Sequence, residues 1–191
     1  FSRIQNRINS DMLIDIKFVV LHNGNQGKLS YNQINKQINV LNTAYSGKYY
    51  TGAKDSKIRF RLKTTQYVNN DNYYNNCQDN DLSISNLYKG DTTKFLTIYT
   101  CNSAYLGWAY YPWSWYEGSS NQVIFINAGS FPYGSYGNYN TGFTAVHEIG
   151  HFFGLPHTFS SNGQCSSDGD DGISDTPLEK SPGYGCNYNR D

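Results

Sequence analysis

The sequence predicts an α/β fold in which two helices pack on a mixed β-sheet. Short runs of β-branched and aromatic residues indicate strands, and two longer segments keep the three-and-four spacing of a helix with one buried face. These segments follow the order strand, helix, four strands, helix, and the rest of the chain has little periodicity. The 191 residues suffice for one domain with a substantial hydrophobic core.

Five segments are predicted to be strands. They cover residues 14–21, 57–67, 95–101, 106–110 and 122–127. In the second of these, Ile58, Phe60 and Leu62 alternate with charged residues, which is the pattern of a strand with one buried face. A turn is expected at 22–25. Irregular chain is expected in the polar arm 1–12 and in the segments 69–81, 129–140 and 154–191.

Two segments are predicted to be helices. The first begins at the N-cap Ser30 and ends near Gly47. Its buried stripe is formed by Ile34, Ile38, Leu41 and Tyr45. The second runs from about residue 141 to 153. One side of the second helix is expected to anchor it to the sheet through Phe143, Val146, Ile149 and Phe153.

Composition excludes several classes of partner. The 15 basic and 15 acidic residues balance, so no electrostatic surface for nucleic acid or an anionic membrane is expected. No apolar run has the length of a membrane span. The chain begins at Phe1, without Met or a signal-like segment, so we expect a processed mature chain.

The four cysteines are Cys77, Cys101, Cys165 and Cys186, and their spacing fits no cysteine-based zinc site. In a chain rich in Gly, Asn and Tyr they favour disulfides, an oxidising compartment and a secreted, extracellular protein; free cytosolic thiols are the alternative. Separation along the chain favours a Cys77–Cys101 pair, because Cys77 precedes a predicted strand and Cys101 ends it. That pairing would leave Cys165 with Cys186.

Residues 147–157, HEIGHFFGLPH, match the pattern H-E-x-x-H-x-x-G-x-x-H. His147 and His151 are four residues apart, so both project from one side of a helix and can bind one zinc ion. Gly154 tolerates the left-handed conformation that ends a helix, and the proline that follows prevents the helix from resuming. The chain then turns, and His157 can supply the third zinc ligand.

Glu148 is the predicted catalytic residue. Three protein ligands leave the fourth zinc position for water, which is typical of a catalytic zinc site. Zinc lowers the pKa of that water and polarises a carbonyl. Glu148 is expected to take the proton from the water and pass it to the leaving amine.

An ordinary amphipathic helix with incidental histidines is the alternative to a zinc site. With ordinary residue frequencies, an accidental match to the five specified positions has odds on the order of 10⁻⁵, which favours the zinc site. The fourth histidine, His22, lies at a predicted strand end and is expected to be structural.

Two further groups of residues have a functional and a structural interpretation. The loop 168–175 concentrates carboxylates and glycines, so it either binds calcium or is a solvated acidic loop. The best calcium ligands are Asp168, Asp171 and Asp175. An aromatic cluster either lines substrate subsites or packs locally; it comprises Trp108, Tyr110, Tyr111, Trp113, Trp115 and Tyr116.

The match extends beyond the zinc motif. The segments HEIGHFFGLPHTF (147–159) and GISDTPLEKSPGYGC (172–186), with Cys165 between them, resemble the pappalysin (cytophagalysin-like) family of metzincin zinc metallopeptidases, especially its ulilysin-like and fungal secreted members. Residues 18–47 resemble that family's first strand and first helix. The resemblance covers essentially the whole chain.

The resemblance implies a metzincin (zincin) fold of the α/β (α+β) class, with a twisted mixed five-stranded sheet, a backing helix and an active-site helix. The N-terminal subdomain would be 1–154, and 155–191 would begin an irregular C-terminal subdomain. The fourth strand would be antiparallel and form the cleft rim, where an extended peptide or protein substrate pairs with Gly107, Trp108 and Ala109. Calcium is implied near 164–176.

The sequence departs from the metzincin pattern at one point. Metzincins have a methionine-containing turn beneath the zinc, downstream of the third histidine, whereas the single methionine here is Met12. We therefore expect a chain that is truncated, autolysed or completed by a second chain. The resemblance also implies that Cys165 and Cys186 each have a partner beyond Asp191.

Two other functions stay open from the sequence. The first is a catalytically inactive zinc-binding fragment or binding module. The second is another zinc hydrolase, such as a deacetylase. The presence of Glu148 disfavours the inactive module, and the expected edge strand for an extended substrate disfavours the deacetylase. A zinc metalloendopeptidase is therefore the main prediction.

Overall fold

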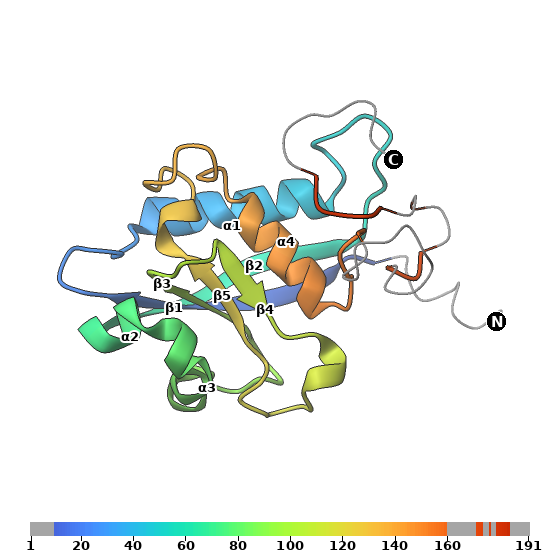
Figure 1. Ribbon diagram of the computed structural model, residues 1–191. Coiled ribbons are helices and arrows are strands. Elements are labelled where there is room, and N and C mark those ends of the chain that lie inside the picture. The colour runs from blue at the N-terminus through green and yellow to red at the C-terminus, as the bar shows by residue number, and fades with distance from the viewer. Residues whose placement is uncertain (1–9, 160–170, 174–175, 177–178, 184–191) are drawn as a thin grey trace. The chain divides into compact units, whose positions relative to one another are not determined.

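The computed structural model describes residues 10–159, 171–173, 176 and 179–183 (Figure 1). The chain divides into two compact units, Phe1–Phe152 and Phe153–Asp191. The strands are β1 (Met12–His22), β2 (Ile58–Asn69), β3 (Leu96–Cys101), β4 (Gly107–Ala109) and β5 (Ile124–Asn127). The helices are α1 (Tyr31–Tyr45), α2 (Asp71–Asn75), α3 (Cys77–Tyr88), α4 (Phe143–Phe152) and the short 3₁₀ turns η2 (Pro112–Ser114) and η3 (Ala128–Ser130).

All five strands of the first unit belong to one sheet, in the order β2-β1-β3-β5-β4. Neighbouring strands are parallel except for β4, which pairs with β5 in the antiparallel sense. The predicted mixed five-stranded sheet is therefore confirmed, and so is the antiparallel orientation of the fourth strand that the family resemblance implies.

Helices cover both faces of the sheet (Figure 1). On one face, α1 and α4 pack on β1, β3 and β5 around a buried cluster that includes Phe18, Ile34, Ile98 and Ile149. On the other face, α3 packs on the same strands around a second cluster that includes Ile84, Tyr99 and Phe125. Burial of these apolar side chains provides the main driving force for packing the layers.

Helix α1 forms as its sequence predicts. The Ser30 hydroxyl accepts a hydrogen bond from the Gln33 backbone, and the Gln33 side chain accepts one from the Ser30 backbone, which makes a capping box. Of the predicted stripe, Ile34, Ile38 and Leu41 are buried. Three apolar positions on one face are enough to bury the helix against the sheet.

Helices α2 and α3 correct the prediction that residues 69–81 form a loop. The Asn70 side chain accepts a hydrogen bond from the Tyr73 backbone at 2.9 Å and caps α2. Helix α3 is polar along most of its length, but it buries Cys77, Ile84 and Ser85. Few apolar residues produce little periodicity, so the helix depends on its tertiary contacts rather than on an apolar stripe.

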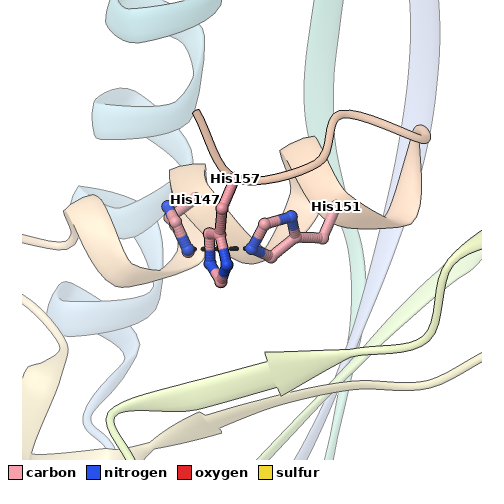
Figure 2. A group of neighbouring side chains, drawn as sticks. All are labelled: His147, His151 and His157. Atoms are coloured by element: carbon pink, nitrogen blue, oxygen red, sulfur yellow. Dashed lines mark hydrogen bonds between the residues drawn. The ribbon is translucent and has the colours of Figure 1, made fainter. Parts of the chain in front are cut away.

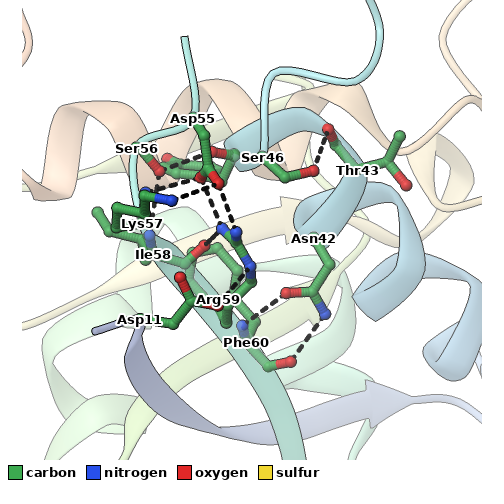
Figure 3. Close-up of polar contacts among 11 residues, drawn as sticks. Asp11, Asn42, Thr43, Ser46, Asp55, Ser56, Lys57, Ile58, Arg59 and Phe60 are labelled. Atoms are coloured by element: carbon green, nitrogen blue, oxygen red, sulfur yellow. Dashed lines mark hydrogen bonds and ion pairs between the residues drawn. The ribbon is translucent and has the colours of Figure 1, made fainter. Parts of the chain in front are cut away.

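At the edge strand β2, side chains form hydrogen bonds with backbone groups (Figure 3). The Asn42 amide donates to the Phe60 carbonyl and accepts from the Phe60 N–H, both at 2.8 Å, as a neighbouring strand would. Nearby, Arg59 donates two hydrogen bonds to the Asp55 carboxylate, at 2.9 and 2.8 Å, and these hold the pKa of Asp55 below its usual value. Asn42 thus shields this edge from pairing with another chain.

The second unit contains one backbone bridge in its described part. Phe159 and Glu179 pair in the parallel sense, and the Thr158 hydroxyl donates to the Glu179 carboxylate at 3.3 Å. None of the helices in the described part of the chain has the length and apolar character needed to span a membrane.

A disulfide joins Cys77, the first residue of α3, to Cys101, the last residue of β3. This is the pair that separation along the chain favours. It fixes the N-terminal end of α3 to the sheet. Cys165 and Cys186 lie outside the described residues.

Replacing both Cys77 and Cys101 by Ala is expected to lower the free energy of unfolding by about 3 kcal/mol. The bond closes a segment whose ends are 24 residues apart, and opening it enlarges the conformational freedom of the unfolded chain. Urea unfolding under non-reducing conditions measures the change. A double variant within about 0.5 kcal/mol of the wild type, the range of neutral surface changes, would contradict the prediction.

Candidate active site

Helix α4 presents its zinc-motif residues because its other side is buried. Ala145 and Ile149, four residues apart, are fully buried in the core. At the helix start, the buried Gln37 side chain donates a hydrogen bond to the Gly142 carbonyl at 2.9 Å. These contacts fix both the position and the rotation of α4, so His147 and His151 are held in a defined orientation.

The predicted anchoring face of α4 needs a correction. Ile149 is buried, as predicted, but Phe143 is half-buried against the ring of Tyr49, and Phe153 lies past the end of the helix and is exposed. Val146 is partly buried and packs against the core, as predicted, and the small Ala145 is fully buried there although it was not predicted. A helix that packs closely on a sheet favours a small residue at the point of contact, and the apolar pattern alone does not show this.

The three predicted zinc ligands come together. One ring nitrogen of each of His147, His151 and His157 lies within 4.8 Å of the others, and Figure 2 shows the three rings converging. The Nε2 atoms of His147 and His151 are 2.9 Å apart. A tetrahedral zinc ion with Zn–N distances of about 2.0–2.1 Å needs nitrogens about 3.4 Å apart. The His147–His151 separation is shorter than that value by about 0.5 Å, and three imidazoles are a donor set that zinc accepts.

Glu148 lies between α4 and the edge strand β4. Its side chain is 6% exposed, and burial raises its pKa to about 7. A Cβ atom added at Gly107 would lie 2.8 Å from the Glu148 Cγ, 2.9 Å from the Phe125 carbonyl oxygen and 3.0 Å from the Thr144 Cγ2. The glycine therefore permits the close approach of the glutamate to β4.

The predicted substrate-binding residues Gly107, Trp108 and Ala109 coincide with β4. Their side chains alternate between the two faces of the sheet. Gly107 lies against Glu148, and Ala109 packs against the core on the α4 face. Trp108 belongs to the opposite face, where its ring stacks on Phe125 at a centroid distance of 4.7 Å.

The predicted aromatic cluster divides into residues with different surroundings. Trp108 and Tyr110 pack on the α3 face, and Trp115 stacks on Phe152 with ring centroids 5.0 Å apart. These three fit local packing. Tyr111 makes an edge contact with His151, at 5.3 Å between ring centroids, and burial together with the Glu148 charge raises the pKa of its phenol.

Two members of the aromatic cluster are exposed, Trp113 and Tyr116. Trp113 stacks on Tyr111, so an aromatic surface continues from the histidines to solvent. His22 is buried, with its Nδ1 atom 2.9 Å from the Gly24 carbonyl oxygen, as expected for a structural histidine.

The predicted calcium ligands are only partly within the described residues. Asp171 is buried, and its carboxylate accepts a hydrogen bond from the Ile173 backbone at 2.9 Å. Asp168 and Asp175 lie outside the described residues, so calcium binding stays a prediction.

Two residues that support the site were not predicted. Gln37 is a polar residue in the otherwise apolar stripe of α1. A polar residue at a buried position of a helix could have indicated a specific hydrogen-bonding role. Asp81 on α3 accepts hydrogen bonds from Trp108 and Tyr110, and nothing in the sequence marks it, because α3 itself was not predicted.

Helix α4 thus carries two of three converging histidines and a buried glutamate beside an antiparallel edge strand. The chain belongs to metallo-peptidase family M12, whose family description matches residues 5–181.

Relatives of this chain include proteins named "Extracellular metalloprotease" from two fungi. The protein from Arthroderma gypseum is 36% identical over 96% of this chain and 61% of its own length, and that from Arthroderma benhamiae is 33% identical over 100% and 63%. The chain thus spans about three fifths of the length of these relatives.

Solved structures of mirolysin have the same fold. Mature mirolysin of Tannerella forsythia in complex with a cleaved peptide matches with a TM-score of 0.77 and 27% identity, over 93% of this chain and 76% of that one. Mirolysin in complex with compound 9 matches with a TM-score of 0.80 and 25% identity, over 94% and 76%.

Replacing Gly107 by Ala is expected to lower the free energy of unfolding by about 1–3 kcal/mol, because the added methyl group would overlap Glu148 and the Phe125 backbone. Denaturant unfolding measures the change. Gly137→Ala is the matched control, since no atom lies within 4 Å of its Cβ position, and it should be neutral or slightly stabilising. Equal stabilities of the two variants would show that β4 does not lie against Glu148.

Proposed function

We propose that this chain forms the catalytic part of a secreted zinc metalloendopeptidase. The observation that carries the proposal is the convergence of His147, His151 and His157, with their ring nitrogens within 4.8 Å of one another. Glu148, adjacent in sequence to the first ligand, is the proposed general base. A peptide or protein is the proposed substrate.

The chain's own residues supply the proton transfers. A zinc ion held by the three histidines would supply Lewis acidity toward a water molecule and a peptide carbonyl. Burial brings the pKa of Glu148 to about 7, so this carboxylate exchanges a proton readily near neutral pH. Glu148 takes the proton of the attacking water and delivers it to the amine of the leaving peptide.

An extended substrate chain is proposed to bind along β4. This strand is at the edge of the sheet and lies against Glu148, so a peptide paired with it would lie beside the base. Mature mirolysin, which shares the fold, is described in complex with a cleaved peptide, and this supports a peptide as the substrate.

The finer assignments rest on the sequence resemblance. We propose membership of the pappalysin branch, extracellular location and calcium binding near Asp171. The names of the fungal relatives and the Cys77–Cys101 disulfide support an extracellular protein. A second polypeptide bonded to Cys165 or Cys186 stays a prediction.

A zinc-binding module without turnover is the second candidate function. Glu148 argues against it, because burying a carboxylate costs free energy that a purely structural zinc site does not require. A deacetylase would have no need of an edge strand against which an extended peptide can pair.

Replacing Glu148 by Ala is expected to leave one zinc per chain and to lower peptidase activity by about 10²–10⁴-fold, the usual contribution of a general base. Metal analysis and cleavage of a denatured protein substrate, with and without a chelator, measure both quantities. Glu117→Ala, at an exposed glutamate, is the control and should retain activity. If the wild-type protein binds one zinc per chain but shows no chelator-sensitive cleavage, the result would favour the binding module.

A further inference from the structure

Strand β4 and the residue that follows it are held from the face of the sheet opposite Glu148. One carboxylate oxygen of Asp81, on α3, accepts a hydrogen bond from the Trp108 indole N–H at 3.3 Å and another from the Tyr110 hydroxyl at 3.0 Å. Trp108 and Tyr110 are two residues apart, so their side chains lie on the same face of the strand. A single carboxylate thus holds two consecutive side chains of that face.

A row of stacked rings continues this contact across the sheet. Trp108 is opposite Phe125 in the pairing of β4 with β5, and Phe125 is opposite Tyr99 in the pairing of β5 with β3. Both neighbouring ring pairs stack with centroids 4.7 Å apart. The Tyr99 hydroxyl lies 3.3 Å from the Ser85 hydroxyl, one helical turn from Asp81. Helix α3 therefore contacts both ends of the row.

Helix α3 is itself fixed at both ends. The disulfide from Cys77 to Cys101 holds its first residue, and the Lys17 ammonium donates a hydrogen bond to the Tyr88 carbonyl, at its last residue, at 2.7 Å. Ile84 between them is fully buried. A carboxylate on such a helix is a fixed point of attachment for β4.

The other face of β4 offers little to hold the strand. Gly107 and Ala109 face α4, where Gly107 lies against Glu148. The strand is three residues long and pairs with β5 only. Its position relative to Glu148 therefore depends on the side chains that face α3.

We propose that Asp81 is a positioning residue for substrate binding, which holds β4 in the register that an extended peptide needs in order to pair with it beside Glu148. This inference rests on the proposed peptidase function. Asp81 touches neither the substrate nor the zinc ligands and acts through Trp108 and Tyr110.

The test measures kcat and KM for a peptide substrate in the Asp81→Ala protein. KM is expected to rise about tenfold with kcat within about twofold, because a displaced edge strand weakens ground-state and transition-state binding alike. Asp81→Asn keeps a side-chain oxygen as acceptor and should restore most of the affinity, with KM about threefold above wild type. Asp79→Ala, an exposed carboxylate two residues earlier on α3, is the matched control and should leave KM unchanged.

Tyr110→Phe removes one of the two donors and leaves the aromatic packing in place. It should raise KM less than Asp81→Ala does, and the double variant should be no worse than Asp81→Ala alone, since both changes remove the same contact. If Asp81→Ala and Asp79→Ala had the same KM, the proposal would be overturned. A loss of kcat at constant KM would overturn it too, because that result would place the effect on Glu148.

A second measurement does not depend on activity. In the ¹H–¹⁵N spectrum, the Trp108 indole N–H signal should move and exchange faster with solvent in Asp81→Ala, while those of Trp113 and Trp115 stay in place. An unchanged Trp108 signal would overturn the proposal. A wild-type protein that cleaves no peptide would refute the proposed function, whereas the indole signal would still report whether Asp81 holds β4.

Discussion

Helix α4 has to satisfy two contacts at once, and the site depends on both. Its inner side packs in the core through Ala145 and Ile149, while Glu148 lies against β4 at a point where only a glycine leaves room. A shift of the helix toward the edge strand would drive Glu148 into Gly107. A shift away from it would open a cavity beneath Ile149. These two contacts fix α4 and therefore also fix the positions of His147 and His151 on it.

The two edge strands of the sheet, β2 and β4, differ in their surroundings. At β2, Asn42 occupies both hydrogen-bonding groups of Phe60, so that edge does not offer a free ladder there. At the other edge, β4 is short, antiparallel and adjacent to the buried glutamate. The proposed strand addition beside Glu148 therefore uses the edge at β4, whereas Asn42 occupies the edge at β2.

Local patterns in the sequence predicted the parts of the fold that are locally determined. Ser30 and Gln33 form a capping box with neighbours in the chain, and the zinc motif places His147 and His151 by helical spacing alone. Helix α3 could not be found in this way, because its apolar residues are few and its stability comes from Cys101, Lys17 and the sheet. The role of Ala145 was missed for a related reason, since a small residue is selected by how closely two layers approach and carries no strong apolar signal.

The order of residues 107–110, Gly-Trp-Ala-Tyr, reflects the opposite demands on the two faces of β4. Toward α4 the side chains must be small, because Glu148 occupies the space above Gly107. Toward α3 they must be large and carry a donor, because only long rings reach the Asp81 carboxylate and stack on Phe125. The alternation of small and large residues in this short strand therefore follows from the close contact with Glu148 on one face and the contacts with Asp81 and Phe125 on the other. A one-residue slip would exchange the two sets, bring Trp108 against Glu148 and leave Asp81 without its donors.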